Sequence, residues 1–167
     1  MKTIKTEKAT FGGGCFWHVQ YAFSQIKGVV STAAGYMGGD EKKYPNVSYD
    51  LLHSQETGYA EIVLVGFDPR IVSYDSLLKV FWKEHDPTTP NRQGPDVGSA
   101  YRSVIFYYSD EQKKRALKSR DEEEKRLDKK IVTQIKKAGK FIRAEEYHQD
   151  YFIKTGMRAC PANLKKK

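Results

Sequence analysis

Apolar and polar residues follow two regular patterns along this chain, one typical of strands and one of helices. Short apolar runs predict strands over residues 8–11, 29–36, 59–67, 103–108, 131–135 and 140–142. Apolar-rich stretches predict helices from residue 16 to Gly28, over 74–85 and, for a short final helix, over 145–153. Ser109, with Gln112 three positions later, predicts the start of a charged helix that runs to about Asp128.

Two stretches carry neither pattern. Residues 37–57 are expected to be irregular, and residues 86–100, with three prolines and two glycines, are expected to form a long functional loop. Strands and helices otherwise interleave without a strict βαβ repeat. This order predicts an α+β fold, a two-layer sandwich in which helices pack on a mixed sheet around a ferredoxin-like core.

Length and composition narrow the class of protein. The 167 residues suit a single catalytic domain, with a core over about 8–153 and a flexible C-terminal tail over about 154–167. An aromatic content of 13% excludes disorder for most of the chain. No apolar stretch approaches the ~18 residues of a membrane span, and the N-terminus lacks the apolar region of a signal peptide. We therefore expect a cytoplasmic location.

Charge is unevenly distributed, because residues 111–167 hold 18 of the 29 basic and 9 of the 21 acidic residues. A net charge of +9 there fits a nucleic-acid or membrane patch, or a solvated helix face followed by a Lys-rich tail. The acidic run Glu122–Glu124 interrupts the basic residues and favours the solvated face.

Cysteine chemistry is the strongest functional signal. Cys15 follows three glycines and precedes a predicted helix, whose N-terminus favours the nucleophilic thiolate. The alternative is a buried structural cysteine, which would not require the glycines or the two aromatic residues that follow. Cys160 is the second of only two cysteines, so no disulfide framework is possible. The histidines do not cluster, and we predict no metal: His18, His53, His85 and His148.

The motif Gly14-Cys15-Phe16-Trp17 resembles the active-site motif of the class A peptide methionine sulfoxide reductases. Other segments resemble the family in the same order, at residues 31–36, 57–61, 85–87, 92–98, 101–103 and 144–149. The resemblance as a whole extends over about residues 8–160. The chain departs from the family's common residues at His18, Gln20 and Tyr59, and no second cysteine follows Cys160 in the tail.

The resemblance implies a reaction and its electron donor. The family reduces the S epimer of methionine sulfoxide, free or in oxidised proteins, without a metal, flavin or other cofactor. Cys15 would attack the sulfoxide sulfur and become a sulfenic acid. Cys160 would then form a disulfide with Cys15, which thioredoxin would reduce. We expect a monomer that binds no specific nucleic acid and no membrane.

The resemblance also assigns roles around the cysteine. Phe16 and Trp17 would form an apolar cage for the substrate methyl group. Glu61, inside an apolar strand where burial raises a carboxyl pKa, would protonate the departing oxygen. Tyr49 and Tyr101 would hydrogen-bond that oxygen, and Asp96 would lie near the site. His148 matches a motif position from which it could support the substrate-contacting residues, and a satisfied structural histidine is the favoured interpretation.

Two other function classes stay open. A thiol peroxidase also uses one reactive cysteine and a sulfenic acid, but it normally has Arg or Thr beside that cysteine, where Phe16 and Trp17 stand here. A basic nucleic-acid-binding domain is the less favoured alternative, because no groove-reading or single-strand motif accompanies the positive charge.

Overall fold

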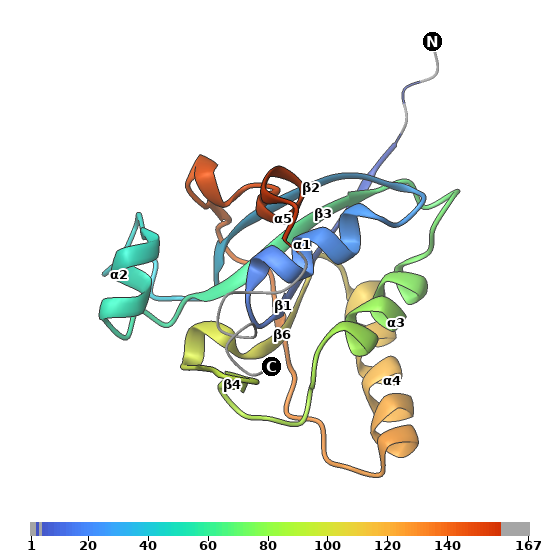
Figure 1. Cartoon of the computed structure of the whole chain (residues 1–167). Coiled ribbons are helices and arrows are strands. Elements are labelled where there is room, and N and C mark those ends of the chain that lie inside the picture. The colour runs from blue at the N-terminus through green and yellow to red at the C-terminus, as the bar shows by residue number, and fades with distance from the viewer. Residues whose placement is uncertain (1–2, 4, 158–167) are drawn as a thin grey trace.

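A six-stranded sheet forms the centre of the protein in a computed structural model that describes residue 3 and residues 5–157 (Figure 1). Its strands lie in the order β7-β6-β1-β3-β2-β8. Neighbouring strands are antiparallel, except that β6 and β7 are parallel. The strands are β1 (Glu7–Gly13), β2 (Val29–Met37), β3 (Ala60–Phe67), β6 (Ser103–Tyr107), β7 (Gln134–Lys137) and β8 (Ile142–Arg143). This mixed sheet confirms the predicted α+β class.

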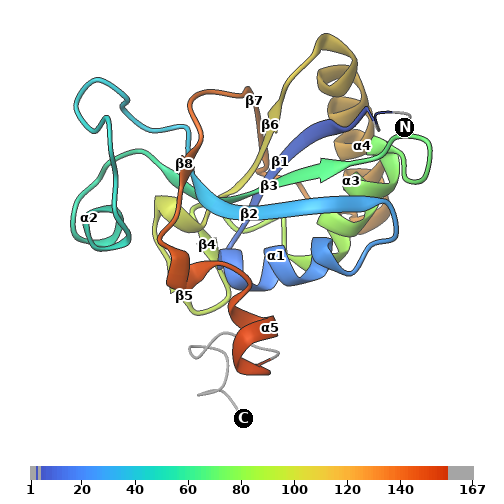
Figure 2. The same cartoon turned by 90° about the horizontal axis from the view of Figure 1, so that it is seen from above.

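Three helices pack on one face of the sheet: α1 (Phe16–Ser24), α3 (Tyr74–Glu84) and α4 (Asp110–Leu127). With the four central strands, α1 and α3 make the βαββαβ order of a ferredoxin-like core. The short helix α5 (Tyr151–Thr155) packs on α1 (Figure 2). On the other face, Ala138 and Phe141 cover a smaller apolar cluster. No described helix has the length and apolar character needed to cross a bilayer.

Strand β3 is buried on both faces, as its apolar run predicts. Side chains alternate along a strand, so Val63 and Val65 join the core under the helices, whereas Ala60 and Ile62 join the cluster on the other face. Glu61 lies two residues before Val63, so its side chain points to the same face of the sheet and faces the helices. A carboxyl group is thus placed among apolar side chains beside the start of α1.

Two irregular stretches contain short elements that the sequence pattern does not reveal. The expectation that residues 37–57 are irregular is wrong for α2 (Tyr49–Ser54), whose first turn is capped by the Ser48 hydroxyl. Six residues are too few to show a helical period. The long loop after α3 holds a small hairpin of β4 (Arg92–Gln93) and β5 (Asp96–Val97), followed by a 3₁₀ turn, η1 (Ser99–Tyr101).

Other boundaries differ for local reasons. The strand predicted over 131–135 begins at Gln134, because the Ile131 and Val132 amides donate to the Glu124 side chain and the Pro87 carbonyl. The helix predicted over 145–153 is split into a 3₁₀ turn, η2 (Glu146–His148), and α5, since Asp150 takes a left-handed conformation (φ 52°). Residues 158–167, which include Cys160, lie outside the described residues.

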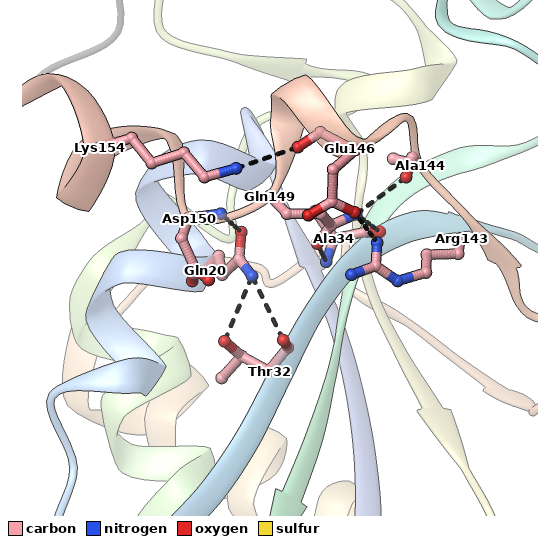
Figure 3. Close-up of polar contacts among 9 residues, drawn as sticks. All are labelled: Gln20, Thr32, Ala34, Arg143, Ala144, Glu146, Gln149, Asp150 and Lys154. Carbon is pink, nitrogen blue, oxygen red and sulfur yellow. Dashed lines mark hydrogen bonds and ion pairs between the residues drawn. The ribbon is translucent and has the colours of Figure 1, made fainter.

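Side-chain amides fasten the C-terminal segment to the sheet and to α1 (Figure 3). The Gln149 amide accepts from the Ala34 N–H and donates to the Ala34 and Ala144 carbonyls, with distances of 2.8 to 2.9 Å. Gln20 accepts the Asp150 N–H at 2.9 Å and donates to Thr32. The chain that leads toward the C-terminus is therefore held against the first helix, next to the Cys15 motif.

Candidate active site

The loop that carries Cys15 is shaped by close packing. Cys15 is partly buried and occupies the N-cap position of α1. Gly14 has a φ of 93°, and a Cβ there would lie 2.6 Å from Cγ of Gln93. A Cβ on Gly13 would lie 3.1 Å from the ring of His85. The glycines before the cysteine thus let the backbone pass between these two side chains and turn into the helix.

His85 supports this loop as a neutral imidazole. Its Nδ1–H donates to the Phe81 carbonyl at 2.6 Å, so its Nε2 accepts from the Ser103 hydroxyl at 2.7 Å. Burial lowers the pKa of His85 to about 4. The ring beneath Gly13 therefore stays uncharged at neutral pH.

Glu61 lies against the backbone that follows the cysteine. Its side chain is 1% exposed, its Oε1 accepts the Phe16 N–H at 3.3 Å, and its Oε2 lies 3.0 Å from Nε2 of His53. Burial raises the pKa of this carboxyl, and the hydrogen bond and charge of His53 partly oppose that rise. Glu61 is thereby poised to hold a proton one residue away from Cys15.

Two tyrosines complete this side of the site. Tyr49 and Tyr101 interact with each other and lie near Glu61, and Tyr49 also lies near Cys15. Burial raises the pKa of Tyr49 to about 12 and raises the pKa of Tyr101 as well, so both are hydroxyl donors at neutral pH. Asp96 lies close to both tyrosines, and burial raises its pKa too.

The two aromatic residues after Cys15 differ in environment. Phe16 is 1% exposed and packs against Tyr36, Tyr49 and His148, with ring centroids 5.1 to 6.5 Å apart. Trp17 is partly buried and stacks on Tyr151 at 3.8 Å. Its indole N–H donates to Nδ1 of His148 at 2.9 Å. This hydrogen bond fixes the plane of the Trp17 ring.

Only one ring nitrogen of His148 has a hydrogen-bond partner among the described residues. Nδ1 accepts from Trp17, so the neutral ring carries its proton on Nε2. Nε2 is buried and has no hydrogen-bond partner among the described residues. The interpretation of His148 as a satisfied structural histidine therefore stays a prediction, with Trp17 as the partner of Nδ1.

Sequence reasoning missed two polar residues around the site. His53 contacts Glu61 from α2, a helix that the sequence pattern does not reveal. Glu145 accepts from the Tyr36 hydroxyl at 2.9 Å and from the Tyr49 amide at 3.2 Å, and so ties the C-terminal segment to α2. His53 lies on an element that the sequence pattern does not reveal, and Glu145 belongs to a family-like segment, but its partners Tyr36 and Tyr49 lie about a hundred positions away.

The residues at which the chain departs from the family pattern are engaged elsewhere. His18 pairs with Glu84 at 3.2 Å, and the hydroxyl of the buried Tyr59 donates to the Tyr44 carbonyl at 2.8 Å. Within residue 3 and residues 5–157, no three His, Cys, Asp or Glu side chains are grouped to hold a metal ion. The site brings together the Cys15 thiol, the buried Glu61 carboxyl with the His53 imidazole beside it, and two phenols.

Comparison with known proteins shows which family has this sequence and this site. A family model described as peptide methionine sulfoxide reductase matches residues 7–167. The chain belongs to the peptide methionine sulfoxide reductase family. It is therefore an oxidoreductase that reduces methionine sulfoxide, which confirms the resemblance and decides among the three function classes that the sequence left open.

Relatives within the peptide methionine sulfoxide reductase family match over most of their length. The protein named peptide methionine sulfoxide reductase MsrA from Methanothermobacter thermautotrophicus is 56% identical over 156 residues, 92% of this chain and 90% of that protein. The MsrA of Geobacter metallireducens is 52% identical over 161 residues, 95% of this chain and 98% of that protein.

Solved structures agree with the fold. The reduced form of Mxr1 from Saccharomyces cerevisiae has a TM-score of 0.89 at 35% identity, covering 96% of this chain and 92% of that one. Methionine sulfoxide reductase A of Corynebacterium diphtheriae has a TM-score of 0.86 at 34% identity, with coverages of 93% and 78%. The mixed sheet and helices described above are thus those of the family.

Proposed function

We propose that the enzyme reduces the S epimer of methionine sulfoxide, free or in oxidised proteins, with Cys15 as nucleophile and Glu61 as general acid. One observation carries this proposal: the buried Glu61 carboxyl contacts the amide of the residue that follows Cys15. A sulfoxide held against Cys15 would place its oxygen next to a protonated carboxyl. Sulfur–oxygen bonds break more easily when the leaving oxygen is protonated.

The chemical step balances with these groups. The Cys15 thiolate, favoured at the start of α1, attacks the sulfoxide sulfur while Glu61 gives its proton to the oxygen. The sulfur–sulfur bond formed by this attack and the oxygen–sulfur bond of the substrate then break. The oxygen and its proton pass to the Cys15 sulfur, and methionine leaves with the electron pair, so Cys15 is oxidised to a sulfenic acid as the sulfoxide is reduced. Tyr49 and Tyr101, both neutral, donate hydrogen bonds to the oxygen as negative charge develops on it.

Substrate orientation is assigned to the aromatic residues. Trp17, held by His148 and Tyr151, would present an ordered apolar face to the methyl group, and Phe16 would support it from the core. Asp96, on the loop after α3, would lie at the edge of the same pocket. His148 would act on the substrate only through the position of Trp17.

Recycling is assigned to Cys160, which lies outside the described residues, as the second of the two cysteines. Its thiol would displace water from the sulfenic acid and form a Cys15–Cys160 disulfide, which thioredoxin would reduce. A structure of yeast Mxr1 in complex with Trx2 supports this choice of reductant. A single catalytic domain, no bound cofactor, a cytoplasmic location and a monomeric state stay predictions.

The proposed epimer preference is tested with separated S and R epimers of a methionine sulfoxide substrate and dithiothreitol as reductant. We expect the S epimer to be consumed and the R epimer to remain. Consumption of both at similar rates would contradict the proposed stereochemistry.

A further inference from the structure

His53 reaches Glu61 from α2. Its Nε2 lies 3.0 Å from Oε2 of Glu61, whereas Oε1 of Glu61 accepts the Phe16 amide at 3.3 Å. The two carboxyl oxygens therefore have different surroundings. Oε2 faces the histidine, and Oε1 faces the backbone next to Cys15.

The His53 ring is held in place by the two tyrosines. Tyr49 packs edge-on against it at 4.4 Å, and Tyr101 stacks on it at 5.2 Å. The side chain of His53 is 26% exposed, while that of Glu61 is 1% exposed. An ordered imidazole thus separates a fully buried carboxyl from solvent.

We propose that His53 is a positioning residue for sulfoxide reduction: its Nε2–H donates to Oε2 of Glu61, keeps the transferable proton on Oε1 beside Cys15, and stabilises the carboxylate left after that proton has moved to the substrate oxygen. The inference rests on the proposed role of Glu61 as general acid. No oxidant, reductant or further proton source is needed for this step.

Electrostatics supports the geometry. When Glu61 gives up its proton, a negative charge is left in a buried site, which is costly unless a donor or cation compensates it. Burial raises the pKa of Glu61, and the hydrogen bond and charge of His53 act against that rise, as does the Phe16 amide. His53 therefore makes the buried carboxyl a stronger acid.

The other ionisable groups around Glu61 do not replace this contribution. Asp96 raises the pKa of Glu61, and each neighbouring tyrosine is itself harder to ionise because of the Glu61 charge. These neighbours come from several elements: Tyr36 on β2, Tyr49 on α2, Asp96 on β5, Tyr101 on η1 and Cys15 at the start of α1. Among the described residues around Glu61, the His53 ring and the Phe16 amide favour the carboxylate.

The test is the pH profile of a single turnover, measured as methionine released from an S-sulfoxide substrate before any reductant is added. Glu61→Gln identifies the limb of the profile that belongs to the acid, because that limb should disappear. His53→Leu should move the same limb to higher pH and lower the maximal rate about 10- to 100-fold, the size of a hydrogen bond to a charged group. His53→Gln keeps an N–H donor without a charge. Its maximal rate and the pH of its acid limb should both lie between those of His53→Leu and of the wild type.

Leu52→Ala is the matched control. Leu52 is buried on the same short helix, so its truncation loosens α2 but leaves the imidazole present. We expect a slower rate at most, with the acid limb at its wild-type pH. An equal shift in Leu52→Ala and His53→Leu would overturn the proposal, since packing of α2 would then explain the effect.

The outcomes separate this proposal from the proposed function. A Glu61→Gln enzyme with a wild-type rate and an unchanged pH profile would refute the proposed role of Glu61 as general acid, and with it the role of His53. A slow Glu61→Gln enzyme combined with a wild-type acid limb in both His53 variants would overturn only the role of His53. If His53→Leu does not fold, as judged by circular dichroism, His53→Ala, which also removes the N–H donor, takes its place: an upward shift of the acid limb supports the proposal, and a wild-type limb refutes it.

Discussion

Replacing Glu61 by glutamine removes one proton from the site and little else. The amide oxygen of the new side chain can still accept the Phe16 N–H, and its NH₂ group can donate to His53 Nε2 after a change of imidazole tautomer. Both buried polar contacts of the side chain are thereby kept. We expect the free energy of unfolding to change by no more than about 1 kcal/mol, because no buried group loses its partner.

The rate should fall much further than the stability. A positioned general acid contributes about 10²- to 10⁴-fold, which equals roughly 2.7 to 5.5 kcal/mol of activation free energy. Tyr49 and Tyr101 remain as neutral donors to the oxygen, so part of the charge stabilisation survives and a complete loss of activity is not expected.

The assay is single-turnover methionine release from an S-sulfoxide substrate by rapid quench, over a range of pH, with thermal unfolding of both proteins as the control for folding. The variant should be slow at every pH and should lose the limb that reports the acid. A wild-type rate with an unchanged pH profile would refute the reasoning and would leave Glu61 as a merely structural buried carboxyl.

The remaining predictions concern the thiols, a buried histidine and the C-terminal segment. Cys15→Ser should abolish reduction with dithiothreitol, since a hydroxyl is not ionised at neutral pH; measurable turnover would contradict this. Cys160→Ser should release about one methionine per enzyme and stall with thioredoxin yet turn over with dithiothreitol; full thioredoxin-driven turnover would exclude the disulfide. The pKa of His85 is lowered by burial from 6.5 to about 4, so the unfolded chain binds its proton first and stability should drop by about 3 kcal/mol as pH falls from 6.5 to 4. Urea unfolding should show this slope, and His85→Asn should flatten it. Gln149→Leu should lower the free energy of unfolding by about 3 kcal/mol at neutral pH, because the Ala34 N–H and the Ala144 carbonyl lose the Gln149 amide, whereas the Ala34 carbonyl keeps the Ala144 N–H; an unchanged urea midpoint would argue against this anchoring.

Patterns within one strand or one helix turn are enough to predict part of the site. Three glycines before Cys15 predict a turn into a helix, and the structure places the cysteine at that N-cap. An apolar run around Glu61 predicts a buried strand, and the carboxyl is indeed almost fully buried in β3. Both features depend on neighbours within a few positions, which is the range over which periodicity is informative.

Contacts between distant segments could not be predicted in the same way. His53 lies on a six-residue helix with no visible period, and its contact with Glu61 depends on how residues 37–57 fold back on the sheet. The hydrogen bond between the side chains of Trp17 and His148 joins residues that are 131 positions apart in the sequence. A motif can place such residues in a family, but it cannot specify which ring nitrogen meets which partner.

The central claim is that Cys15 takes the oxygen from the S epimer of methionine sulfoxide. It is tested most directly in the Cys160→Ser enzyme, incubated without reductant with one equivalent of either the S or the R epimer in separate reactions. A cyclic dione that reacts specifically with sulfenic acids is present, and the peptide that contains Cys15 is then analysed by mass. We predict about one methionine and one dione adduct on Cys15 per enzyme with the S epimer, and neither with the R epimer. Methionine release while Cys15 remains an unmodified thiol would contradict the account.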